Sequence, residues 1–245
     1  MVQPATFLRR LEIDSRARRK QPTLISLFSG CGGAALGIRQ AGFEVRVFVE
    51  FDETCCETLA ANWIKPPRGA PKSERRPWHQ RRDPVIMRAD LTKLSTAEIL
   101  AAAELAIGEA DCLEGGFPCQ GFSTSGKRMI DDPRNRLYRE CVRVIGEALP
   151  RFFVLENVPG LISMGGGTVM CQICEDLAEV GYDVQWDILN AADFGVPQNR
   201  KRVFILGHRV DHMHIAGKRV QLFMGAAPGA IYHPEFFLKR LEKIR

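Results

Sequence analysis

The sequence lacks any hydrophobic run that approaches the ~20 residues needed for a membrane-spanning helix. Its first twenty residues lack the apolar stretch and the cleavage site of a secretory signal. It also contains no internal repeat and no low-complexity tract, which excludes repeat architectures. We therefore expect a globular protein of the cytoplasm that makes no contact with membranes.

A disulfide framework is not expected either, although the chain contains eight cysteines. Several of them fall in segments with strand or helix patterns, and 245 residues can bury a core large enough to fold without cross-links. Cys171 and Cys174 form a CxxC pair, but no second pair of ligands follows at the spacing of a zinc site. We predict that both pack within a helix and that the chain holds no metal.

Acidic side chains are scarce in two segments, which carry the surplus of positive charge. Residues 1–22 contain six Arg and Lys against two acids, and residues 64–84 contain seven against two, together with five prolines. The rest of the chain has 21 basic and 25 acidic residues. We expect a basic N-terminal arm and a Pro-rich basic insertion, which either attract a polyanion such as nucleic acid or remain solvated.

Apolar, β-branched segments alternate with segments of helical spacing along most of the chain. The expected strands are 24–28, 44–50, 85–91, 111–116, 151–158, 182–189 and 202–207. The expected helices are 35–42, 52–63, 95–107, 137–149 and 168–180. This alternation predicts an α/β fold with a doubly wound, mostly parallel sheet of the Rossmann-like kind. One catalytic domain over 23–208 would contain the insertion, and residues 209–245 would form a C-terminal extension.

Residues suited to chemistry follow five of these strands. In such sheets ligands bind beyond the carboxyl ends of the strands, so residues at these positions are expected to lie close together. They are Gly30 and Gly32, Glu50, Asp90, Cys119 and Glu156.

The first part of this edge has the features of an adenosine site. The turn FSGCGG lets the backbone approach a ligand at the start of a helix. At the next strand end Glu50 is placed to accept both hydroxyls of a ribose, and Phe51 to pack against an adenine. Asp90 is placed to accept a hydrogen bond from the adenine amine. The turn lacks the third glycine of a dinucleotide-binding fingerprint, since Ala35 stands there, which favours a cofactor without a pyrophosphate.

The second part has the features of a reacting site. In GGFPCQGFSTSG (115–126), Pro118 stiffens a glycine-flanked turn that presents Cys119 on a loop. Glu156 and Asn157 end a later strand. In QNRKR (198–202), Gln198, Arg200 and Arg202 alternate, so an extended strand would point all three to one face.

These motifs, in this order, resemble those of the DNA (cytosine-5) methyltransferases from about residue 24 to residue 208. The resemblance implies S-adenosylmethionine (SAM) as methyl donor, S-adenosylhomocysteine as product and double-stranded DNA as substrate. The cofactor-binding residues that it implies are Phe28, Ser29, Gly30, Cys31, Gly32, Gly33, Glu50, Phe51, Asp90, Leu91 and Pro118. The implied substrate-binding residues are Gln120, Ser123, Asn157 and Gln198.

The resemblance also implies the chemistry. Cys119 adds to C6 of a flipped-out cytosine, so that C5 can take the methyl group of SAM. Glu156, when protonated, donates to N3 of the base and accepts from its N4 amine. Arg200 and Arg202 orient the base, the carboxylate and a phosphate. The commonest setting of the family is restriction-modification.

The chain departs from typical members after QNRKR. Residues 209–245 are too short for a target-recognition region and contain no GNS-type motif, and residues 1–22 supply no permuted copy. The chain thus resembles the catalytic subunit of two-subunit members, and we expect a second polypeptide that carries target recognition.

Three other functions are considered beside DNA cytosine methylation. A tRNA cytosine methyltransferase has a similar order of motifs, although QNRKR looks more like the DNA-modifying members. A non-catalytic module that binds SAM or DNA would fit the missing C-terminal motifs. An NAD oxidoreductase is disfavoured by the incomplete glycine fingerprint and by the PCQ loop.

Overall fold

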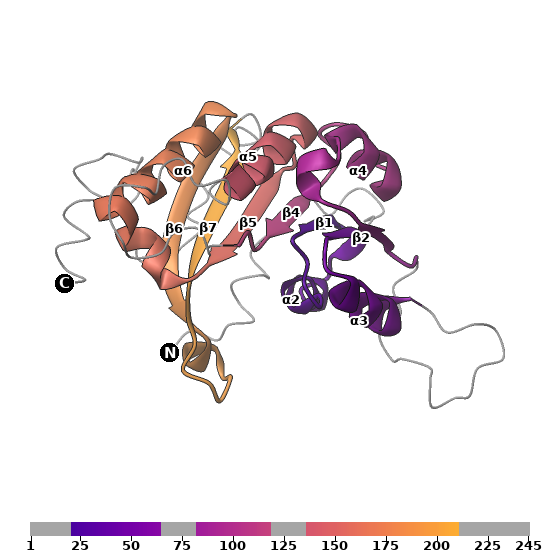
Figure 1. Ribbon diagram of the computed structural model, residues 1–245, viewed down its shortest axis with the longest axis horizontal. Coiled ribbons are helices and arrows are strands. Elements are labelled where there is room, and N and C mark those ends of the chain that lie inside the picture. The colour runs from indigo at the N-terminus through magenta and orange to yellow at the C-terminus, as the bar shows by residue number, and fades with distance from the viewer. Residues whose placement is uncertain (1–20, 65–81, 119–135, 211–245) are drawn as a thin grey trace, which may run out of the picture.

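The computed structural model describes residues 21–64, 82–118 and 136–210, and these residues form one seven-stranded sheet flanked by helices (Figure 1). The strand order is β3-β2-β1-β4-β5-β7-β6. The strands are β1 (Thr23–Leu27), β2 (Glu44–Glu50), β3 (Val85–Arg88), β4 (Cys112–Gly115), β5 (Phe152–Asn157), β6 (Tyr182–Asn190) and β7 (Lys201–Arg209). The α-helices are α2 (Gly33–Gln40), α3 (Glu53–Trp63), α4 (Thr96–Ala103), α5 (Arg136–Ala148) and α6 (Thr168–Glu179).

The first five strands are parallel, and the last two form an antiparallel hairpin. β1 pairs with β2 on one side and with β4 on the other, and β3 and β5 extend the sheet outward. β7 inserts antiparallel between β5 and β6. The strand order reverses between β1 and β4, so the crevice where open α/β sheets bind ligands lies at the carboxyl ends of these two strands.

Helices cover both faces of the sheet, as a mostly parallel sheet requires (Figure 1). One face packs α4, α5 and α6 against a large core that includes Ile25, Leu113 and Phe153. The other face packs α2 and α3 against a smaller cluster that includes Leu24 and Phe48. Neighbouring residues of β1 thus point to opposite cores, which explains why the central strands are apolar at every position.

The sequence-based expectations for the fold are confirmed, with small differences at the ends of elements. β3 ends at Arg88 rather than at residue 91, because Asp90 caps a short 3₁₀ helix, η2 (Leu91–Lys93). Cys171 and Cys174 lie on α6, where Cys174 is buried and Cys171 packs against the same core. None of the helices within the described ranges is long and apolar enough to cross a membrane.

Much of the expected basic arm, of the insertion and of the C-terminal extension lies outside the described residues. α3 ends at Trp63 and β3 begins at Val85, so the insertion joins these two elements. The domain limits at residues 23 and 208 remain a prediction.

The contact between β5 and β7 leaves no room for a side chain at Gly207. A Cβ atom there would lie 2.1 Å from Cε1 of Phe153, whose ring is fully buried and packs against Tyr182 at 5.2 Å. We expect Gly207→Ala to lower the free energy of unfolding by about 1–3 kcal/mol, the usual cost of overpacking. Urea denaturation measures this change.

The matched control is Gly37→Ala on α2, where a Cβ atom meets nothing within 4 Å. That variant is expected to gain about 0.5–1 kcal/mol from helix propensity. Equal stability of the two variants would contradict the packing of β5 on β7.

Candidate active site

The glycine turn after β1 is shaped by residues that need a left-handed backbone. Phe28 and Gly30 both have φ of 51°, and Gly32, which precedes α2, has φ of 82°. A Cβ atom on Gly32 would lie 2.8 Å from both Cδ2 of Leu59 and Nε1 of Trp63. Only glycine fits there, because both neighbours belong to the packed helix α3. The turn therefore sits tightly against α3 at the start of α2.

The carboxylate of Glu50 holds this turn and the start of α3 together. Its Oε2 accepts a hydrogen bond from the backbone N–H of Gly30 at 2.6 Å. Its Oε1 accepts from the N–H groups of Phe51 and Asp52 at 2.8 and 2.9 Å. Asp52 in turn caps α3 by accepting from the N–H of Cys55. Glu50 thus organises the backbone at the edge where a ribose was predicted to bind, with Phe51 beside it and 72% exposed.

The third predicted cofactor element is a capped turn. One oxygen of Asp90 accepts from both the N–H and the hydroxyl of Thr92, and these bonds lower the pKa of the Asp90 carboxyl. Leu91 is buried in the main core, so its side chain supports the turn instead of facing a ligand. The contact between Leu91 and a cofactor stays a prediction, and it would involve the backbone of Leu91.

The turn that leads to Cys119 is held by β5. Phe117 is buried and lies 6.3 Å, ring centre to ring centre, from Tyr138 on α5. Its carbonyl accepts a hydrogen bond from Nδ2 of Asn157 at 3.0 Å. Asn157 is itself buried, and its Oδ1 accepts from the N–H of Val158. The amide predicted to contact substrate is thus engaged in positioning the GGFP segment.

Glu156 lies next to this segment and forms an ion pair with Arg202. Nε of Arg202 on β7 is 3.0 Å from Oε1 of Glu156 on β5. Oε2 of Glu156 lies 3.7 Å from the position that a Cβ atom on Gly116 would take. Both side chains remain partly exposed, at 23% and 33%. The carboxyl of Glu156, paired with Arg202, therefore lies beside the chain three residues before Cys119.

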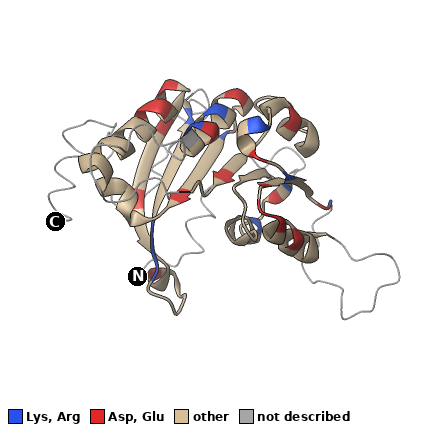
Figure 2. Ribbon diagram, viewed as in Figure 1, with Lys and Arg blue, Asp and Glu red and all other residues tan. Residues whose placement is uncertain are grey.

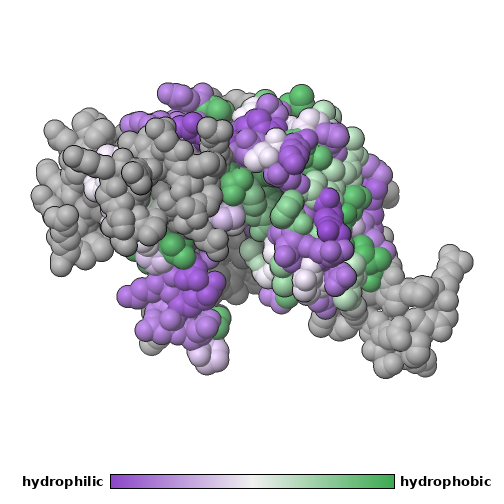
Figure 3. Space-filling view, viewed as in Figure 1, coloured by the Kyte–Doolittle hydropathy of each residue, from purple (hydrophilic) through white to green (hydrophobic). Residues whose placement is uncertain are grey.

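The prediction that Gln198, Arg200 and Arg202 share one strand face is wrong, because β7 begins only at Lys201. Pro197 cannot donate a ladder hydrogen bond, and the N–H of Gln198 donates to the carbonyl of Val196 in a tight turn. Gln198 and Arg200 are exposed on the tip of the β6–β7 hairpin, which projects as a hydrophilic protrusion (Figure 3). Within the described residues, only Arg202 of the three pairs with Glu156.

One functional candidate was missed from the sequence. Glu114 lies in the middle of β4 and is only 5% exposed. It accepts a hydrogen bond from the hydroxyl of Ser26, which lies 2.8 Å from the hydroxyl of Ser29 in the glycine turn. Burial, and then the negative charge of Glu156, raise the pKa of Glu114 to about 7, against the opposing effect of the Ser26 bond. A lone glutamate in a strand pattern gives no signal of such burial.

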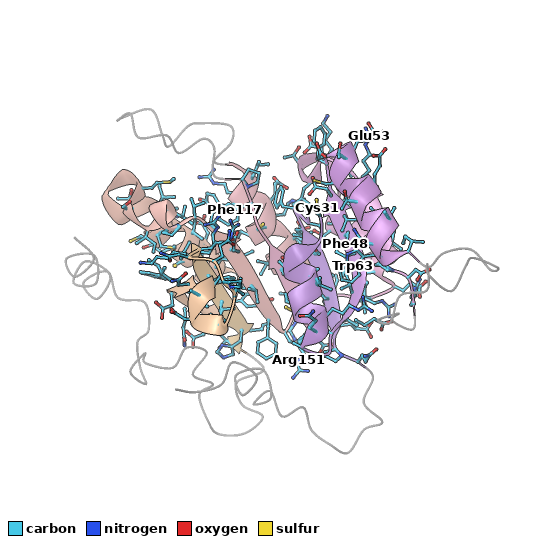
Figure 4. All side chains as sticks on the ribbon, turned by 90° about the horizontal axis from the view of Figure 1, so that it is seen from below. Cys31, Phe48, Glu53, Trp63, Phe117 and Arg151 are labelled. Atoms are coloured by element: carbon cyan, nitrogen blue, oxygen red, sulfur yellow. The ribbon has the colours of Figure 1, made fainter. Side chains whose placement is uncertain are left out.

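Both halves of the site lie at one edge of the sheet. Figure 4 shows Cys31 and Phe117 toward the same edge, with Arg151 at the opposite one. Figure 2 shows acidic residues along this edge, where β4 and β5 end. The structure therefore brings together the glycine turn, Glu50, Glu156, Arg202 and the segment ending at Pro118. Cys119, Gln120 and Ser123 lie outside the described residues.

Loss of one acceptor oxygen at Glu50 should loosen the glycine turn. In Glu50→Gln the amide nitrogen cannot accept, so at least one of the three backbone N–H groups loses its partner. We expect the free energy of unfolding to fall by about 1–3 kcal/mol, the usual cost of an unsatisfied donor. Thermal denaturation of this variant beside Glu57→Gln, which changes an exposed acid on the neighbouring helix α3, tests the assignment. If both variants kept the wild-type melting temperature, the role of Glu50 in holding the glycine turn would be contradicted.

Comparison with known proteins matches the chain to one family. A family model described as C-5 cytosine-specific DNA methylase matches residues 23–77 and 78–227. The chain is 43% identical over 196 residues to the type II methyltransferase M.AquIA of Picosynechococcus sp., which covers 76% of this chain and 72% of that protein. It is 40% identical over 190 residues to M1.HphI of Haemophilus parahaemolyticus, which again covers 76% of this chain but 46% of that protein.

Solved structures agree with this match. A putative DNA modification methyltransferase encoded within an E. coli prophage aligns with a TM-score of 0.62 and 30% identity, over 78% of this chain and 47% of that one. A DNMT2 mutant of Spodoptera frugiperda aligns with a TM-score of 0.57 and 18% identity, over 82% of this chain and 53% of that one, and supports the fold alone. By sequence, motif order and fold, the chain belongs to the C-5 cytosine-specific DNA methylase family.

Proposed function

We propose that this chain transfers a methyl group from SAM to C5 of cytosine in DNA, with Cys119 as nucleophile. The observation that carries the proposal is the Glu156–Arg202 pair beside the segment that leads directly to Cys119. The chain spans 72% of M.AquIA but less than half of M1.HphI, so the activity of the whole protein is inferred from its catalytic segment.

The residues at the glycine turn fit a SAM molecule. The tight turn from Phe28 to Gly32 lets a ligand approach the backbone at the start of α2. Glu50 lies at the adjacent strand end with its carboxylate fixed by three N–H groups, and exposed Phe51 offers an aromatic face. Bound there, SAM supplies an electrophilic methyl group.

The residues of the second half perform the remaining steps. The thiolate of Cys119 adds to C6 of cytosine, and the C5–C6 electron pair becomes available at C5, which takes the methyl group. Removal of the C5 proton then returns an electron pair to the ring, and the S–C6 bond breaks. The carboxyl of Glu156 binds the N3 and N4 edge of the base, and Arg202 keeps that carboxyl in place by its ion pair.

A cytosine within a duplex is inaccessible to a thiol above its plane, so the target base must leave the stack. The exposed tip of the β6–β7 hairpin, which carries Asn199, Arg200 and Lys201, lies next to Arg202 and is placed to contact the DNA backbone. A DNA substrate also implies an intracellular location.

Single-turnover methyl transfer tests the reaction. The full chain is held in large excess over duplex DNA, and tritiated SAM is supplied. Weak DNA binding then does not limit the rate of methyl transfer. We expect label in duplex DNA and none in tRNA, and a loss of at least about 10³-fold in Cys119→Ser, since a hydroxyl is a far weaker nucleophile.

Cys171→Ser replaces a partly buried thiol on α6, outside the candidate site, so it serves as the matched control and should retain the wild-type rate. Transfer that survives in Cys119→Ser, transfer to tRNA in preference to DNA, or no transfer by the wild type would each contradict the proposal.

We propose further that a second polypeptide supplies target recognition. M.AquIA and M1.HphI align over nearly equal lengths, yet the aligned part is 72% of the first and 46% of the second. The two relatives therefore differ in how much chain they carry outside the aligned segment, and the proposal of a separate recognition polypeptide needs a direct test.

Mixing tests this arrangement. The part of M1.HphI outside the aligned segment is purified and added to the full chain at equal concentration. We expect steady-state methylation of a duplex to rise at least about tenfold on mixing, because recognition lowers the KM for DNA. Full sequence-specific methylation by the chain alone would show that no partner is needed.

A further inference from the structure

The buried acid Glu114 has a place in the site that the methyl-transfer mechanism does not use. It lies on β4 between Ser26 of β1 and Val154 of β5, the two residues that face it in the sheet. Val154 is two residues before Glu156, so Glu114, Ser26 and Glu156 share one face of the sheet. The buried carboxyl of Glu114 therefore lies between the glycine turn and the proposed base-binding pair, Glu156 and Arg202.

A continuous hydrogen-bond chain joins Glu114 to the glycine turn. The hydroxyl of Ser26 lies within hydrogen-bond distance of a Glu114 oxygen and at 2.8 Å from the hydroxyl of Ser29. The hydroxyl of Ser29 lies 3.0 Å from the carbonyl of Ser26 and 3.3 Å from that of Val49. The next residue, Gly30, is the one that Glu50 holds through its N–H.

Each hydroxyl has a single hydrogen, so the direction of this chain depends on the proton of Glu114. When Glu114 is protonated, it donates to Ser26, Ser26 donates to Ser29, and Ser29 donates to a carbonyl of β1 or β2. When Glu114 is ionised, Ser26 must donate to it and no longer donates to Ser29, so the chain loses one hydrogen bond, either between the two serines or between Ser29 and a carbonyl. The protonated state therefore fastens the glycine turn to the sheet more firmly.

The charged group that raises the pKa of Glu114 is the carboxylate of Glu156. Among the described residues, the titratable groups that interact with Glu114 are Glu156 on β5, Cys112 on β4 and Cys141 on α5. Burial raises the pKa of both thiols far above neutrality, so they stay uncharged. Arg202 lies beyond Glu156 and partly offsets its charge. A change in the charge of Glu156 is thus transmitted to Glu114 and onward to Ser26.

We propose that Glu114 is a positioning residue, whose proton sets the direction of the Ser26–Ser29 hydrogen-bond chain and couples the charge of Glu156 to the order of the cofactor turn. The inference rests on the proposed function only in naming the turn as the cofactor site. Base binding at Glu156 and cofactor binding at the turn are then linked through one buried proton.

Hydrogen exchange of the full chain tests this proposal without any ligand. Protection factors of a peptide covering residues 28–33 are measured from pH 5.5 to 8.5 and corrected for intrinsic exchange rates. We expect wild-type protection to fall about tenfold, the equivalent of one hydrogen bond, with a midpoint near the Glu114 pKa of about 7. Protection falls as the pH rises, because the favourable form of Glu114 is the protonated one.

Four variants separate the coupling from a merely structural role. Glu114→Gln keeps the neutral pattern, since its amide can donate to Ser26, and its protection should not change with pH. Ser26→Ala should also lose the pH dependence, because the chain is broken. Glu156→Gln should keep the transition but move its midpoint to lower pH, as the charge that raises the pKa is removed. Glu179→Gln, an exposed acid at the end of α6, should behave as wild type.

The same variants are then titrated with SAM by calorimetry at pH 6 and pH 8. Wild type is expected to bind SAM several-fold more weakly at pH 8, and Glu114→Gln equally at both values. The inference would be overturned if the pH dependence of protection persisted in Glu114→Gln. It would also be overturned if the midpoint in Glu156→Gln equalled that of the wild type. Absence of SAM binding by the wild type at either pH would instead contradict the proposed function and leave the exchange result to decide the role of Glu114.

Discussion

Parallel pairing of β1 with β4 is the constraint from which the candidate site follows. Leu27 lies opposite Gly115 in this pair, so the glycine turn that follows β1 and the GGFP segment that follows β4 leave the sheet side by side. β5 pairs with β4 in the same direction and brings Glu156 to that edge. Both faces of the sheet are packed, so these strand ends have little freedom to move apart.

Polar contacts then hold the functional groups in position at this edge of the sheet. Glu50 fastens the glycine turn through three backbone donors, and Asn157 fastens the carbonyl of Phe117. The Glu156–Arg202 pair crosses from β5 to β7, which lie side by side as antiparallel strands. The same carboxyl raises the pKa of buried Glu114, which touches the glycine turn through Ser26. The two halves of the site are therefore electrostatically connected within the protein.

The sequence predicted the strands and helices well, because apolar β-branched runs and helical spacing depend on local pattern. It also predicted that Gly30, Gly32, Glu50, Asp90 and Glu156 lie at the carboxyl ends of the strands, since parallel topology alone brings them there, whereas the place of Cys119 stays a prediction. It misplaced Gln198 and Arg200, because the alternation of the strand was extended back into the turn that follows Pro197. It overlooked Glu114 and gave no indication that Asn157 holds the carbonyl of Phe117, because hydrogen-bond partners and burial in the sheet depend on contacts between strands that no local pattern contains.

The central claim is that the sulfur of Cys119 bonds to C6 of a target cytosine. The most direct measurement is mass-spectrometric mapping of the chain after incubation with SAM and a duplex in which 5-fluorocytosine replaces the target, since fluorine blocks the release step. The account predicts a covalent DNA adduct on the peptide that contains Cys119, and none in Cys119→Ser. An adduct on any other cysteine, or no adduct in the presence of the recognition polypeptide, would contradict it.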